Sequence, residues 1–292
     1  MTNNRLQKLP DFMVVGAQKA ATTWLFECLD EHPEIFVPVK KELHFFCNLD
    51  DCRFSSKNKG MNWYLSQFDT HKEVKFVGEL TTDYMYYEHV AKELYDFNSN
   101  LKIVVLLRNP VERAYSAYWM WKRHNKKLPP FGQMIRQPGN SFIRRGLYGQ
   151  QIKPYLELFG KSRVRVYVLE EIKLSPDKFI EDLYQFIGVN KVFRPRALYK
   201  QVAETKNYPG VVGRIVYKGL SPILNARGVR AVWRFIRRKT KAKELVLQIL
   251  FGSGGKGKYP DMSIDDRNFL AEQFRCENEN LAQLLGRNIN VW

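Results

Sequence analysis

Short apolar runs alternate along the chain with longer segments in which apolar residues recur at helical spacing. The runs rich in β-branched and aromatic residues predict strands at Phe12–Val15, Phe76–Gly78, Lys102–Leu107 and Val164–Leu169. The segments with helical spacing predict helices at Thr22–Glu31, Pro110–Arg123, Gln150–Phe159, Pro176–Ile187 and Ile264–Leu285. Because strands that alternate with helices build a mostly parallel sheet flanked by helices, we expect an α/β fold.

The size and composition of the chain predict one domain. It has 292 residues, of which 45% are hydrophobic, and no linker rich in Gly, Ser or Pro divides it. A chain of this length is within the range of a single α/β unit with insertions. We therefore expect one domain over residues 1–292.

No segment predicts a membrane anchor or a secretory signal. The longest apolar stretches, 103–107 and 245–251, are far below the roughly 18 residues that a spanning helix needs. The polar opening segment carries no apolar signal core, so we expect a cytoplasmic protein. The four cysteines show no spacing typical of a metal site and the five histidines are scattered, so we also expect no metal.

The charge of the chain predicts anionic partners. The net charge is +17, and residues 211–259 hold twelve basic residues against one acid, Glu244. A nucleotide, a sulfated or phosphorylated substrate, a nucleic acid or a lipid surface would each complement it. Drawn as a helix, part of this segment is basic on one side and apolar on the next. It would then bind an anionic membrane surface or a polyanion, or form only a solvated basic face.

The first chemistry-bearing stretch follows the first predicted strand. That strand ends near Gly16, a helix starts near Thr22, and Lys19 lies between them. Such a turn directs free backbone N–H groups and the positive end of the helix dipole at one point, which predicts an anion site. The loop is too short for the G-x-x-x-x-G-K-[ST] pattern of nucleotide triphosphate enzymes. An ordinary turn with a surface lysine is the alternative for this stretch alone.

The second stretch, Lys102–Trp121, predicts another strand-to-helix turn. Asn109 suits the N-cap, Pro110 the first helical turn, and Glu112 completes an N-x-x-E capping arrangement. Arg108 lies at this turn and Ser116 lies two turns into the helix. Taken alone, Arg108 could equally be a surface arginine paired with Glu112.

The two stretches together resemble the sulfotransferases that use 3′-phosphoadenosine 5′-phosphosulfate (PAPS), in particular the heparan-sulfate-type and related bacterial members. Their R-N-P-x-x-R-x-x-S-x-Y motif is matched throughout from Arg108 to Tyr118, and their K-x-G-T-T loop is matched except that Ala21 replaces Gly. The resemblance implies a nucleotide-binding core like that of P-loop proteins, with Arg108 and Ser116 at the 3′-phosphate. It implies that the first loop holds the phosphosulfate through Gln18, Lys19, Ala20, Ala21, Thr22 and Thr23.

A third match implies the catalytic groups. Lys40-Lys-Glu-Leu-His-Phe-Phe46 is similar to the K-E-x-H-F-F stretch in which the family's Glu is the general base. Transfer to a hydroxyl needs a group that removes the acceptor proton, so we expect Glu42 to be the base. If the segment is extended, His44 falls on the same face and is the second candidate for the base, or its orienting partner. Lys19 would offset charge on the leaving oxygen.

Weaker matches extend the resemblance to residues 12–190 and 254–292. Gly78–Tyr84 resembles G-E-K-[ST]-P-x-Y, but Leu80 stands in place of the lysine. Tyr148 lies in a G-x-Y-G stretch and is expected near the cofactor. The stretch Gly254–Pro260 resembles the K-G-R-x-x-P loop, which implies cofactor contacts from Lys256, Gly257 and Lys258. Residues 195–250, the variable basic segment, are expected to shape the acceptor side.

The sequence therefore predicts transfer of a sulfuryl group from PAPS to an acceptor hydroxyl, with an amine as the alternative acceptor group, with release of adenosine 3′,5′-bisphosphate and without a metal. The acceptor would be a sugar, a lipid or a small metabolite, and no local pattern identifies it. A basic nucleic-acid-binding module and a nucleotide-binding but inactive family member are the alternatives. No specific nucleic-acid partner is expected, because such a module leaves the motif from Arg108 to Tyr118 unexplained.

Overall fold

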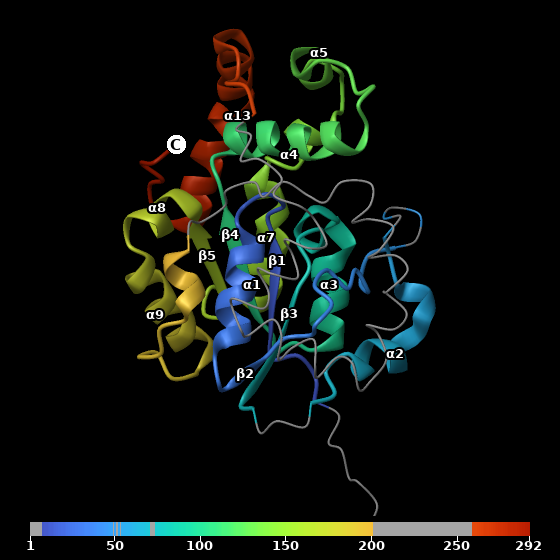
Figure 1. Cartoon of the computed structure of the whole chain (residues 1–292), viewed down its shortest axis with the longest axis vertical. Coiled ribbons are helices and arrows are strands. Elements are labelled where there is room, and N and C mark those ends of the chain that lie inside the picture. The colour runs from blue at the N-terminus through green and yellow to red at the C-terminus, as the bar shows by residue number, and fades with distance from the viewer. Residues whose placement is uncertain (1–7, 49, 51, 53, 71–73, 201–258) are drawn as a thin grey trace, which may run out of the picture. The chain divides into compact units, whose positions relative to one another are not determined.

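Five parallel strands form the centre of the fold, in the order β2-β3-β1-β4-β5 (Figure 1). Their bounds are β1 Phe12–Gly16, β2 Ile35–Phe36, β3 Phe76–Leu80, β4 Lys102–Leu107 and β5 Val164–Val168. Phe12 of β1 pairs with Gly78 of β3 on one side and with Lys102 of β4 on the other. Every residue of β1 is buried, as expected for a central parallel strand covered on both faces.

Helices cover this sheet and follow its strands. The α-helices are α1 Thr22–Glu31, α2 Gly60–Ser66, α3 Glu88–Phe97, α4 Pro110–His124, α5 Phe131–Ile135, α6 Ser141–Arg144, α7 Tyr148–Phe159, α8 Leu169–Leu174, α9 Pro176–Ile187 and α13 Ile264–Leu285. Short 3₁₀ helices lie at η1 Lys57–Lys59, η2 Tyr84–Tyr86 and η3 Arg196–Tyr199.

The strand order places the functional loops at a reversal of the sheet. From β1 the chain runs to the β2 edge, and from β3 it crosses past β1 to β4 and β5. Because such connections are right-handed, helices before and after the reversal lie on opposite faces. The crossover helices α3 and α7, which come after the reversal, are accordingly in contact through Tyr95 and Phe159. Trp24 of α1, which comes before it, instead stacks with Phe179 of α9, a helix that follows the last strand β5 and is not a crossover. Ligands of open α/β sheets bind beyond the strand ends at such a point, here at β1 between β3 and β4.

The structure, a computed structural model, describes residues 8–48, 50, 52, 54–70, 74–200 and 259–292. Apart from Tyr259 and Pro260, these residues belong to one compact unit formed by Met1–Ala203 and Asp261–Trp292. The described residues do not include Lys256, Gly257 and Lys258, which were expected to contact the cofactor. They also exclude nearly all of the segments 195–250 and 211–259. The single-domain prediction therefore stays a prediction.

The predicted fold class is confirmed, and the predicted elements are present with small shifts of their ends. The strand predicted to reach Leu169 ends at Val168, because Leu169 begins α8. The helix predicted from Gln150 begins at Tyr148. The hydrophobic pattern did not predict β2 or the helices α2, α3, α5, α6 and α8. Within the described part of the chain, none of the helices combines the length and the apolarity needed to cross a membrane.

Candidate active site

The first loop joins β1 to α1, and the amino end of α1 has neither a side-chain cap nor an acidic residue in its first turn. Ala21, the N-cap residue, has a φ of 61°. The first backbone N–H groups of a helix have no partner within the helix. Because neither a side-chain cap nor an acidic residue of the first turn offsets them, the amino end of α1 is suited to an anion.

The six predicted phosphosulfate contacts lie together in this loop. Lys19 also has a positive φ, 72°, so the backbone turns sharply between Gly16 and Thr22. Ala20 and Thr22 are buried, whereas Thr23 is exposed. The amide oxygen of Gln18 is buried and accepts no hydrogen bond from the described residues.

Positive charges converge on Lys19. Burial, together with the charges of Arg108, Arg123 and Lys41, lowers the pKa of Lys19 to about 8. Arg108 reaches the loop directly, since its Nη1 donates to the carbonyl oxygen of Lys19 at 3.3 Å. Four cations around one loop would be stabilised by a bound polyanion.

Arg123 is a member of this group that the sequence analysis missed. It lies on α4 seven residues after Ser116, which is two helical turns and therefore the same face of the helix. That spacing is the signal that could have identified it, although it lies beyond the matched motif.

The second loop lies between β4 and α4. Of the two capping interactions predicted there, the structure contains the one made by the Asn109 side chain. The Oδ1 atom of Asn109 accepts the backbone N–H groups of Val111 at 3.0 Å and Glu112 at 3.3 Å. The reciprocal half is wrong, because the N–H of Asn109 donates to Glu170 rather than to Glu112. Glu112 instead pairs with Arg267 at 2.8 Å and lies 4.0 Å from Arg108.

Buried polar residues support this second loop. Ser116 is 3% exposed on α4, and Tyr148 is fully buried with its hydroxyl donating to the Arg108 carbonyl oxygen at 2.9 Å. Tyr148 thus contacts the motif, and its expected approach to the cofactor stays a prediction. Burial lowers the pKa of Arg113 to about 10, and its Nε and Nη1 atoms have no partner among the described residues.

Glu42 lies beside the first loop, joined to it by one lysine. Lys41 Nζ is 3.0 Å from Glu42 Oε1, 3.1 Å from Thr22 Oγ1 and 3.2 Å from Thr23 Oγ1. The other carboxylate oxygen of Glu42 accepts the backbone N–H of Thr82 at 2.7 Å. The structure therefore places the predicted base next to the amino end of α1.

His44 points away from this contact. The segment is not extended as expected, because Glu42 and His44 have φ values of 61° and 53°. The Nδ1 atom of His44 lies 3.5 Å from Asp83 Oδ2 and 3.9 Å from Cys52 Sγ. Burial lowers the pKa of His44, so its imidazole is neutral near pH 7. An extended backbone was the condition for the two side chains to share one face, and the structure does not meet it.

Glu79 is a buried carboxyl group beneath the site that the sequence analysis did not single out. It accepts hydrogen bonds from Tyr64 at 2.6 Å, Thr81 at 2.6 Å and Tyr84 at 2.8 Å. Burial raises the pKa of Glu79 to about 7 despite these donors. Both of its carboxyl oxygens are occupied by these donors, which favours a structural role.

Comparison with known proteins identifies the family of this chain. A family model described as "Sulfotransferase domain" matches residues 9–209. The chain is 23% identical to human "Bifunctional heparan sulfate N-deacetylase/N-sulfotransferase 3", which aligns with 98% of this chain, although the chain spans only 31% of that protein. It is 26% identical to human "Heparan sulfate glucosamine 3-O-sulfotransferase 6", with 70% of this chain and 58% of that protein covered.

A solved structure agrees with the fold. The crystal structure of a sulfotransferase from Alicyclobacillus acidocaldarius superposes with a TM-score of 0.70 and 25% sequence identity. The match covers 98% of this chain and 99% of the other.

Proposed function

The chain belongs to the sulfotransferase domain family, and we propose that it moves the sulfuryl group of PAPS to an acceptor hydroxyl, releasing adenosine 3′,5′-bisphosphate. The observation that carries this proposal is the Lys41 bridge between the Glu42 carboxylate and the threonines of the first loop. One site then contains an anion-binding helix end and a carboxylate able to take a proton.

The residues present fit PAPS as the donor. Its phosphosulfate would lie at the amino end of α1, where the first N–H groups, Lys19 and Thr22 provide donors and positive charge. The 3′-phosphate would be held by Arg108 with Ser116, which follow the adjacent strand β4. Both anionic ends of one nucleotide would thus be bound at neighbouring strand ends.

The transfer step would displace the nucleotide in line. The acceptor oxygen forms a bond to sulfur while the bond from sulfur to the bridging oxygen breaks, and that electron pair stays on the 5′-phosphate. Glu42 takes the acceptor proton, and Lys19 offsets the charge that develops on the leaving phosphate. As in phosphoryl transfer, positioning and electrostatics supply most of the catalysis.

Lys41 has a specific place in this scheme. Its ammonium contacts Glu42 and the two threonines, so it holds the base against the donor site in the absence of ligand. We expect the lysine to shift toward the phosphosulfate when the donor binds. Glu42 would then lose its ion pair with Lys41, keep its hydrogen bond from Thr82, and be free to accept a proton.

The acceptor is proposed at the level of its class. Two relatives are named for sulfation of heparan sulfate, one for N-sulfation and one for 3-O-sulfation. A glycan hydroxyl is therefore the first acceptor to test, ahead of lipids and small metabolites. The cytoplasmic location and the membrane or polyanion contacts of 211–259 stay predictions.

The first experiment measures cofactor binding without an acceptor. Calorimetric titrations compare adenosine 3′,5′-bisphosphate with 5′-AMP and ATP at one salt concentration. We expect adenosine 3′,5′-bisphosphate to bind tighter than 5′-AMP. Equal binding of all three nucleotides would remove the basis for the 3′-phosphate site, and a steeply salt-dependent affinity for any oligonucleotide would favour the nucleic-acid alternative.

A second experiment separates an enzyme from an inactive nucleotide-binding protein. With PAPS labelled in the sulfuryl group, a panel of glycans and small hydroxyl compounds is screened with the wild type and with Glu42→Gln. Transfer by the wild type alone, with equal nucleotide affinity in both, supports the assignment. Nucleotide binding without transfer to any acceptor in the panel would favour the inactive reading.

A further inference from the structure

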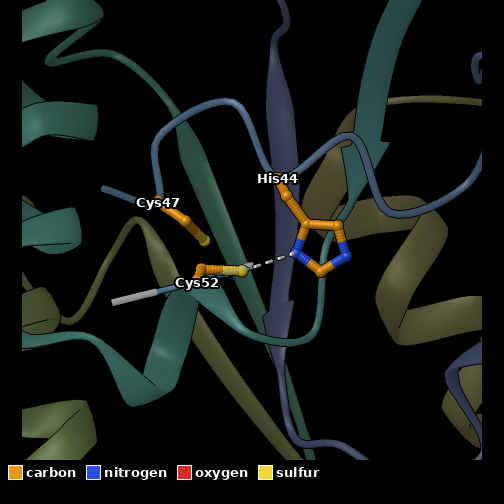
Figure 2. Close-up of side chains that lie close together, drawn as sticks. All are labelled: His44, Cys47 and Cys52. Atoms are coloured by element: carbon orange, nitrogen blue, oxygen red, sulfur yellow. Dashed lines mark hydrogen bonds between the residues drawn. The ribbon is translucent and has the colours of Figure 1, made fainter. Parts of the chain in front are cut away.

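One imidazole nitrogen and two thiol sulfurs come together just after Glu42. His44, Cys47 and Cys52 each offer one donor atom, and these atoms all lie within 4.8 Å of one another. Figure 2 shows the side chains of both cysteines pointing toward the His44 ring. We propose that the three residues bind a thiophilic divalent metal ion, of which Zn²⁺ suits this donor set best.

The distances are close to those of a tetrahedral zinc site. With Zn–S bonds of about 2.3 Å and Zn–N bonds of about 2.0 Å, neighbouring sulfur and nitrogen ligands lie about 3.6 Å apart, and two sulfurs about 3.8 Å apart. Cys52 Sγ is 3.9 Å from His44 Nδ1. Since none of the separations exceeds 4.8 Å, each donor pair would close by about 1 Å or less on binding an ion.

Asp83 provides a candidate for the fourth ligand. Its Oδ2 atom lies 3.5 Å from His44 Nδ1, near the roughly 3.4 Å expected between oxygen and nitrogen ligands on one zinc ion. It is not part of the group within 4.8 Å, so it would turn toward the sulfurs, or a water molecule would complete the site. Arg145 holds the other oxygen of Asp83 at 2.6 Å and would orient it.

Charge and burial also suit a metal. Cys47 is fully buried and Cys52 is 3% exposed. A divalent ion with two thiolates and a neutral imidazole has no net charge, and Arg145 would offset the charge of Asp83 if that carboxylate became the fourth ligand. This balance lowers the penalty for placing the ion in the interior. Two buried cysteines alone could be ordinary small apolar residues. The imidazole nitrogen that meets their sulfurs is what distinguishes this cluster.

The backbone already folds the segment around the donors. The N–H of Cys52 donates to the Asn48 carbonyl oxygen at 3.0 Å, and the N–H of Ser56 donates to the His44 carbonyl oxygen at 3.2 Å. A bound ion would fix this turn and thereby the position of Glu42, two residues before His44. His44 is then a ligand that positions the base, not a base itself. The metal site does not rest on the proposed sulfuryl transfer.

The test measures metal in the untagged protein. The wild type, purified in the presence of Zn²⁺ and then desalted, is expected to contain about one equivalent of zinc per chain by mass spectrometry. The double variant Cys47→Ser/Cys52→Ser is expected to lose it. Cys276→Ser, at an exposed cysteine, and Cys28→Ser, at a buried one, are the matched controls and should keep it. Circular dichroism checks that each variant is folded.

A second measurement uses only the wild type and therefore does not depend on whether a variant folds. Reduced wild type stripped of metal is titrated with Co²⁺, and thiolate-to-cobalt charge-transfer absorption with the intense visible bands of tetrahedral cobalt is expected. An absence of these bands would overturn the proposal, as would zinc that persists in the folded double variant. A Cys47–Cys52 disulfide in the isolated protein overturns it as well, if the reduced protein then takes up no Co²⁺.

Discussion

We expect Lys19 to make nucleotide binding depend on pH. Burial and the charges of Arg108, Arg123 and Lys41 lower the pKa of Lys19 from 10.5 to about 8 in the free protein. A bound phosphosulfate or phosphate would place negative charge beside the ammonium and raise this pKa again. Above pH 8 the free protein must therefore take up a proton when it binds the nucleotide, and binding weakens as the pH rises.

The size of this effect follows from the pKa. With a pKa of about 8, Lys19 is roughly nine-tenths protonated at pH 7 and one-tenth protonated at pH 9, so the affinity should fall roughly tenfold across this interval. Calorimetric titration of adenosine 3′,5′-bisphosphate in buffers of different ionisation enthalpy measures the protons taken up. We expect uptake to rise from about 0.1 proton at pH 7 to about 0.9 at pH 9.

The matched control is Lys19→Arg, which keeps a positive charge that does not titrate in this range. In this variant the extra proton uptake at pH 9 should disappear, whatever the change in affinity. If the wild type takes up no proton at pH 9, or if the variant takes up as much, then Lys19 does not titrate at the nucleotide site and the electrostatic argument is wrong.

Three further predictions concern Glu42, Arg108 and Glu79. Glu42→Gln should lower turnover at least roughly a hundredfold without weakening nucleotide binding, because proton removal is lost while Lys41 and the other cations of the first loop remain; equal turnover would exclude Glu42 as the base. Arg108→Ala should reduce the preference for adenosine 3′,5′-bisphosphate over 5′-AMP at least roughly tenfold in calorimetry, since a charged hydrogen bond contributes about 1.5–3 kcal/mol; an unchanged preference contradicts the clamp. The pKa of Glu79 is raised from 4.5 to about 7 on folding, so its contribution to stability is full below pH 4.5 and declines as the pH rises to 7. Urea unfolding should show about 3 kcal/mol of this decline in the wild type and none of it in Glu79→Gln, and parallel pH profiles would refute it.

The sequence predicted the elements whose patterns are long or strongly capped. Three helices have the predicted bounds, because each combines helical spacing with a clear signal for the start or the end of a helix. They are Thr22–Glu31, Pro176–Ile187 and Ile264–Leu285. The strand β2 contains only Ile35 and Phe36, too few residues to show alternation. Its pairing with β3 depends on contacts across about forty residues of chain, which local patterns do not report.

The site was predictable where it lies in contiguous motifs and not where distant segments meet. Both anion-binding turns and Glu42 follow from short stretches of sequence. Glu79 is recognisable only once Tyr64 and Tyr84 are seen to enclose it. His44, Cys47 and Cys52 lie within nine residues, but their spacing alone does not show that the chain turns back and brings the three donor atoms together.

Backbone strain in the described residues is concentrated in the first loop, between β1 and α1, and in the segment Lys40–Phe46 that contains Glu42. The non-glycine residues with positive φ in that part of the chain are Lys19, Ala21, Glu42 and His44. Each such conformation costs roughly 1–3 kcal/mol and persists only where the surrounding structure enforces it. Here the ends of the sheet do so, since the N–H of Ala17 donates to Leu106 at 2.6 Å and that of Glu42 donates to Leu80 at 3.0 Å.

This distribution explains how the first loop keeps its backbone conformation without the glycine of the family pattern. Ala21 adopts the left-handed conformation that glycine takes freely, because the strand end before it and α1 after it fix the path of the backbone. The loops carrying Lys19 and Glu42 are thus held in place by β4 and β3, neighbours of β1, before any ligand arrives. Groups fixed in this way need not reorganise when charge develops during transfer, which is the condition under which electrostatic stabilisation is most effective.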